Sequence, residues 1–80
     1  MQSVNVGIWG AVELAKSDRQ VAVANALVEL QRELVEYLEQ EGGDIVSAIN
    51  VFDSLLLSLA LSVNHRHRLR RTISEQVDAA

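Results

Sequence analysis

Four polar residues in the middle of the chain have the types and spacing of a magnesium site. Glu33 and Glu36 are three residues apart, and so are Asn50 and Asp53, so each pair lies on one face of a helix. Carboxylate and amide oxygens are ligands that Mg²⁺ accepts. If two antiparallel helices carry these pairs, the four side chains can approach one another and hold one ion.

This spacing distantly resembles the ExxE and ExxD pairs of the all-α, MazG-like nucleotide pyrophosphohydrolases, and the sequence NVFDSLLLSL is similar to the surroundings of the family's aspartate. The resemblance implies Mg²⁺-dependent hydrolysis of nucleotides. It departs at one ligand, because Asn50 stands where that family has glutamate. Acid pairs at this spacing are also ordinary on solvated helix faces. Without a cysteine or another nucleophile–base arrangement, we expect that the protein is not an enzyme.

A second cluster, HRHRLRR at residues 65–71, is strongly basic. An antiparallel fold brings residues 16–20 to the same height, and two of the arginines point toward the apolar side of their helix. Buried arginines are rarely left unpaired. Three interpretations follow: the layer holds ion pairs with Asp18, Glu13 and a neighbouring subunit, it binds a small phosphate or carboxylate, or the helix end frays and the arginines are solvated. The candidate anion-binding residues are Arg66, Arg70, Arg19 and Lys16.

Other chemistry at this basic end is disfavoured. The four arginines spread around the helix with no aromatic residue between them, and the chain has a net charge of −4, so we do not expect nucleic acid as a partner. His65 and His67 point about 200° apart on a helix and cannot share a metal. We expect no cofactor, with Mg²⁺ needed only under the hydrolase alternative.

The elements that position these residues form one helical domain over residues 1–80. Apolar residues recur at helical spacing on both sides of Gly42-Gly43, and Asp44 is a good N-cap. The pattern predicts a helix over about residues 6–41, with a bend near Ser17, a turn at 42–43 and a helix over about 45–77. Two alternatives stay open at the beginning of the chain, a short separate helix and a strand over residues 3–8.

The apolar residues predict self-association of this helical hairpin. They make up 49% of the chain, and two helices alone cannot bury so wide an apolar arc. A membrane span is disfavoured because Asp53 and several serines interrupt the apolar run of residues 45–63. We expect an antiparallel hairpin that assembles into a four-helix bundle or a larger oligomer. Its predicted core consists of Leu27, Leu30, Leu34, Ile49, Phe52, Leu56, Leu59 and Val63. Within one chain, the predicted pairs are Leu34 with Phe52, Leu27 with Leu59 and Val23 with Val63.

The preferred function is a small self-associating, regulatory or binding module that acts through protein–protein contacts. A further partner protein would dock on the exposed flank at Leu57 and Leu61 or on the acids around the turn, Glu33, Glu36, Glu39, Glu41 and Asp44. The absence of cysteine and of a basic leader favours a cytoplasmic location. The two alternatives are a binder of a small anion and the nucleotide pyrophosphohydrolase.

Overall fold

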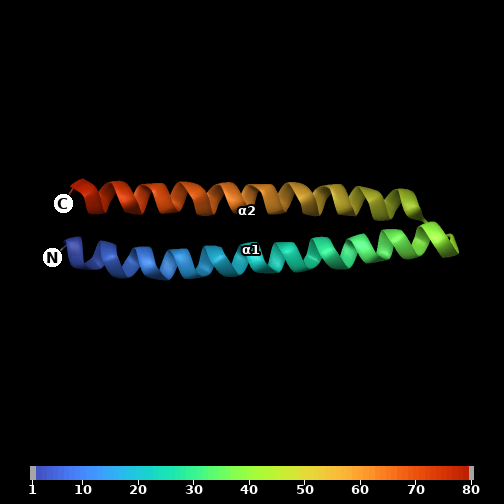
Figure 1. The fold of residues 1–80 in the computed structure, drawn as a ribbon, viewed down its shortest axis with the longest axis horizontal. Coiled ribbons are helices and arrows are strands. Elements are labelled where there is room, and N and C mark those ends of the chain that lie inside the picture. Colours follow the sequence, from blue (N-terminus) through green and yellow to red (C-terminus); the bar gives the residue numbers. More distant parts are fainter. Residues whose placement is uncertain (1, 80) are drawn as a thin grey trace.

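The chain folds into two long antiparallel helices that lie side by side (Figure 1). The computed structural model describes the backbone of residues 2–79 and the side chains of residues 7–76. Helix α1 spans Gln2–Glu41 and helix α2 spans Ile45–Ala79. The two chain ends lie together at one end of the molecule, and the turn forms the other. The predicted all-α helical hairpin is therefore confirmed.

The first helix is longer than its sequence pattern suggested. It runs without interruption from Gln2, so the alternatives of a separate N-terminal helix and of a strand over residues 3–8 are both wrong. No proline occurs in the chain, and the only glycines in α1 are Gly7 and Gly10. Nothing in this segment therefore breaks the helical hydrogen bonding, and α2 runs antiparallel beside α1 toward the chain ends (Figure 1), which favours a continuous helix.

Three residues make the whole turn. Gly42 has a φ of 87° and donates its N–H to the Leu38 carbonyl at 2.8 Å, which ends α1 with a left-handed residue. Asp44 then caps α2, because its carboxylate accepts the Ser47 N–H at 3.1 Å and the Ser47 hydroxyl at 2.7 Å. These bonds to the charged form lower the pKa of Asp44, the bond from the Ser47 hydroxyl contributing most.

The contact between the helices is a heptad seam, in which buried or half-buried residues recur at alternating spacings of three and four. It includes several small residues, which let the two backbones approach closely. A Cβ added to Gly10 would lie 3.1 Å from Ile73, for example. The seam of α1 comprises Gly10, Leu14, Ser17, Val21, Ala24, Val28, Gln31, Val35 and Leu38, and that of α2 comprises Ile45, Ala48, Phe52, Leu55, Leu59, Ser62, Arg66, Leu69 and Ile73.

This seam differs from the predicted pairing of the arms. Val23, Leu27 and Leu34 were expected to face α2, but they are 58%, 44% and 44% exposed. The prediction followed the largest apolar side chains, whereas α1 turns a neighbouring stripe of smaller ones toward α2. On α2, Phe52 and Leu59 do lie in the seam, while Val63 stays on its flank, 39% exposed.

The hairpin is elongated and exposes more surface than a compact chain of its mass. It measures 60 × 15 × 13 Å, and its radius of gyration is 18.0 Å against about 12 Å for a compact domain of this length. Its accessible surface is 5934 Å², about 1,100 Å² more than the roughly 4,800 Å² typical of a folded monomer of 8.8 kDa. Two helices with one seam account for this excess.

Candidate functional site

The most distinctive surface of the hairpin is an apolar stripe on α1, which we call the α1 stripe. Its members recur at spacings of three and four, and they lie on one flank of the helix, beside the seam. They are between 44% and 63% exposed, although they include some of the largest apolar side chains of α1. The α1 stripe consists of Val23, Leu27, Leu30, Leu34 and Tyr37.

Exposed apolar residues on α2 are spread more widely around the helix. By helical spacing, Ile49, Leu56 and Val63 lie on one flank, Val51 and Leu61 on the other, and Leu57 points outward. By length and composition alone, α2 is the one helix in the described residues that is apolar enough to cross a membrane, with a mean hydropathy of 1.8 in its most apolar part. Only 6% of that part is buried within the hairpin.

The structure divides the predicted oligomer core into two groups. Phe52 and Leu59 already lie in the seam between α1 and α2. The others remain available on the surface, between 39% and 63% exposed. These exposed members are Leu27, Leu30, Leu34, Ile49, Leu56 and Val63.

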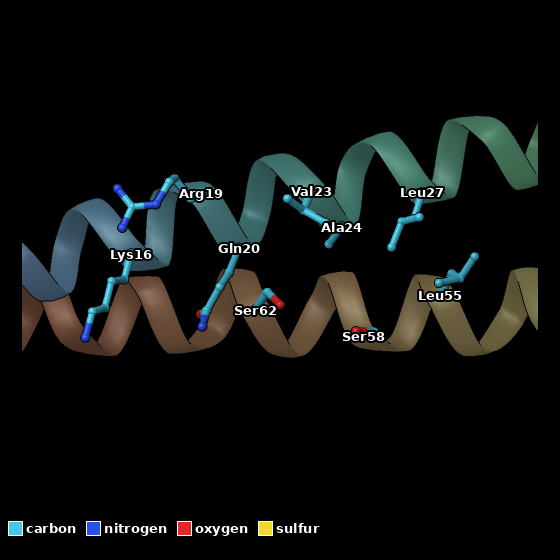
Figure 2. Close-up of a pocket in the computed structure, with 9 residues that line it drawn as sticks. All are labelled: Lys16, Arg19, Gln20, Val23, Ala24, Leu27, Leu55, Ser58 and Ser62. Atoms are coloured by element: carbon cyan, nitrogen blue, oxygen red, sulfur yellow. The ribbon is translucent and has the colours of Figure 1, made fainter.

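A groove of about 750 Å³ runs beside the N-terminal half of the α1 stripe, between the two helices (Figure 2). Its apolar part is formed by Val23, Ala24 and Leu27 on α1 and by Leu55 on α2. The hydroxyl-bearing residues of its α2 wall are Ser58 and Ser62. At the end toward the chain termini it is bordered by Lys16, Arg19 and Gln20. The groove can therefore take an apolar side chain that is flanked by acidic groups.

The predicted arginine layer forms, and Asp18 lies at its centre. One carboxylate oxygen of Asp18 lies 3.7 Å from Arg66 and 3.6 Å from Arg70. Asp18 therefore lies between the two guanidinium groups. The anion-binding hypothesis placed a bound phosphate or carboxylate at this position. The side chains are 29% to 58% exposed, so these ion pairs add little stability.

The other two residues of the predicted anion site lie elsewhere. Lys16 and Arg19 border the groove, and Lys16 pairs with Glu13 at 3.6 Å. Because Lys16 and Asp18 are two residues apart, they point about 200° away from each other. The structure thus splits the four basic residues between two faces of the hairpin.

The hairpin does not assemble the predicted magnesium ligands. Glu33, Glu36, Asn50 and Asp53 are all exposed. Among the described residues, no three or more His, Cys, Asp or Glu side chains gather into a group that could hold a metal ion. Within one chain, the carboxylate pairs therefore remain separate features of two helix surfaces.

Charge is divided between the two ends of the molecule. The part next to the turn, residues 29–53, carries seven acids and one arginine, a net charge of −6. The described remainder, residues 7–28 and 54–76, carries three acids and six basic residues, a net charge of +3. We call these the acidic tip and the basic end. The hairpin is strongly polar along its 60 Å axis.

Comparison with protein-family models, with curated proteins and with solved structures finds no match to this chain. Its function is therefore argued from its own surfaces. Sequence reasoning picked out four members of the α1 stripe but assigned three of them, Val23, Leu27 and Leu34, to contact with α2, and it did not find the groove. The signal was available in the small residues of α1, since Gly10, Ser17 and Ala24 recur every seven residues.

Proposed function

We propose that this protein is a self-associating helical module, whose hairpins pack together through the large apolar side chains that a single hairpin leaves exposed. The observation that carries the proposal is the α1 stripe, five neighbouring apolar residues that are each at least 44% exposed. A contiguous apolar surface of this kind marks an interaction site. Further copies of the chain provide the same surface and can cover it.

The energetics of the single hairpin support this proposal. Among the side chains that the structure describes, residues 7–76, the buried apolar ones are Val21, Ala24, Val28, Ala48 and Leu69, and two of these five are alanines. A core of this size supplies little stability to an 80-residue chain, which also has no disulfide. The surface in excess of a compact monomer, about 1,100 Å², exceeds the roughly 800 Å² that each partner contributes to a standard interface.

The same surfaces favour protein over lipid as the covering partner. Asp53 lies near the middle of the apolar part of α2, where an aspartate in a bilayer costs about 2.5–3.5 kcal/mol. Ser47, Ser54 and Ser58 accompany it on the exposed surface. Polar residues between apolar ones suit a bundle of several helices, because some positions of each helix then face water.

The proposal is tested by sedimentation of a matched pair of variants. Leu30→Glu places a charge in the α1 stripe, and Asn25→Glu places the same charge at an exposed position on the opposite flank of the same helix. The wild type and Asn25→Glu should sediment as oligomers, whereas Leu30→Glu should dissociate and lose helical circular dichroism. A helical wild-type monomer at tens of micromolar would overturn the proposal. So would a wild type that associates only with phospholipid vesicles.

A further inference from the structure

We infer that the partner in the groove is the α1 stripe of a second copy, packed antiparallel about Leu30, with the acidic tip of each copy on the basic end of the other. This inference rests on the proposed self-association and specifies its geometry. It is carried by three observations: the position of the groove, the symmetry of the α1 stripe and the charge of the two ends.

The α1 stripe is self-complementary when it is reversed. With Leu30 at the two-fold axis, Leu34 of the second copy lies level with Leu27, and Tyr37 of the second copy lies level with Val23. Each large apolar residue then meets another one across the axis. The interface is isologous, as most homodimer interfaces are, and each such contact occurs twice.

The groove lies where the second copy's side chains arrive. Ion pairing of Asp18 with Arg66 and the contact of Gly10 with Ile73 fix the register of α2 along α1. This register sets Ser58 and Ser62 level with the region around Val23. Tyr37 of the second copy therefore enters the groove beside these serines, whose hydroxyls can bond its phenol group. Leu34 of the second copy fills the apolar part beside Leu27 and Leu55.

Charge selects the antiparallel orientation over the parallel one. Beyond the apolar contacts, the antiparallel arrangement brings Glu41 and Asp44 of the second copy close to Lys16 and Arg19 at the end of the groove. In a parallel arrangement the two acidic tips, each with a net charge of −6, would lie against each other. Opposite patches attract and like patches repel across an interface, so the bipolar hairpin favours the antiparallel pair.

Cysteine pairing tests the orientation, because the chain has no native cysteine. Leu27→Cys and Leu34→Cys are prepared separately, mixed as reduced proteins and oxidised. We expect mainly the mixed disulfide between the two variants, since the antiparallel pair sets these positions side by side. A matched control, Asn64→Cys mixed with Leu34→Cys, should give almost none, because Asn64 lies on the outer side of α2.

The outcomes separate this inference from the proposed function. Disulfides of each variant mainly with itself would show a parallel pair and overturn the inference, although the protein would still self-associate. The protein could also sediment as an oligomer while the yield of the mixed disulfide stays at the level of the Asn64→Cys control. This result would show that the copies associate through another face, and it would also overturn the inference. A wild type that is monomeric in sedimentation would instead overturn the proposed function.

A charge exchange provides the second, independent readout. Lys16→Glu should weaken the dimer about tenfold, because two symmetry-related attractions become repulsions. Glu41→Lys should do the same. The double variant should recover most of the wild-type affinity, since each lysine then faces a glutamate of the other copy. If the dimer of the double variant loses as much affinity as the two single changes combined, the inference is wrong.

Discussion

At the scale of single residues, Ser17 is the clearest departure from a well-paired interior. It lies in the seam with only 1% of its surface exposed, and its hydroxyl has no hydrogen-bond partner. A buried hydroxyl without a partner loses its bonds to water and gains nothing in return. Serine is nevertheless suited to the site by size, because a small side chain lets the helices approach closely near the arginine layer.

Replacing this hydroxyl should therefore stabilise the protein. Ser17→Ala keeps the small volume and removes the unpaired group, so we expect the free energy of unfolding to rise by about 1 kcal/mol more than in a surface control. Ser74→Ala is that control, since Ser74 is exposed on α2 and the same change in helix propensity applies to it. Urea denaturation at one protein concentration measures both. A lower stability of Ser17→Ala would show that its hydroxyl is bonded.

At the scale of elements, the two helices and their turn could be predicted from the sequence, but the seam could not. The Gly-Gly pair and the Asp44 cap are local signals, because backbone conformation and capping depend on adjacent residues. The seam depends on which of two overlapping stripes of α1 faces α2. Leu27 and Leu34 are larger than their neighbours Ala24 and Val28, so hydrophobicity alone selected the wrong stripe. Because α1 instead turns the stripe of smaller residues toward α2, the α1 stripe stays exposed and a groove forms beside it.

The turn gives a prediction at this scale. Gly43 has a φ of 134°, and a Cβ added there would lie 2.7 Å from the Leu38 side chain, so Gly43→Ala should reduce the free energy of unfolding by about 1–3 kcal/mol. Gly7→Ala is the matched control. It adds a methyl group in open space within α1 and should stabilise by about 0.5–1 kcal/mol. Chemical denaturation of the two variants should thus give shifts of opposite sign, and equal shifts would contradict the turn geometry.

At the scale of the whole molecule, shape and charge lead to the same conclusion. A 60 Å hairpin with one narrow seam has too little interior for its length, and its large apolar residues lie outside that seam. Its opposite ends carry opposite charge. Both features are weaknesses of an isolated hairpin, yet they become complementary surfaces when copies pack antiparallel. Folding and assembly of this chain should therefore be coupled.

Coupling of this kind makes stability depend on protein concentration. If only the folded state self-associates, a hundredfold increase in concentration stabilises it by about 2.7 kcal/mol, so the melting temperature of the wild type should rise by several degrees. Circular dichroism melts over a hundredfold concentration series measure this directly. At the lowest concentrations helicity should fall together with the oligomer in sedimentation, because the small apolar core that residues 7–76 form in one hairpin cannot hold it. Leu30→Glu should show the same low helicity at every concentration of the series. A wild-type melting temperature that stays constant while helicity is retained would show that the single hairpin is stable alone, and that its exposed apolar surface does not hold it folded.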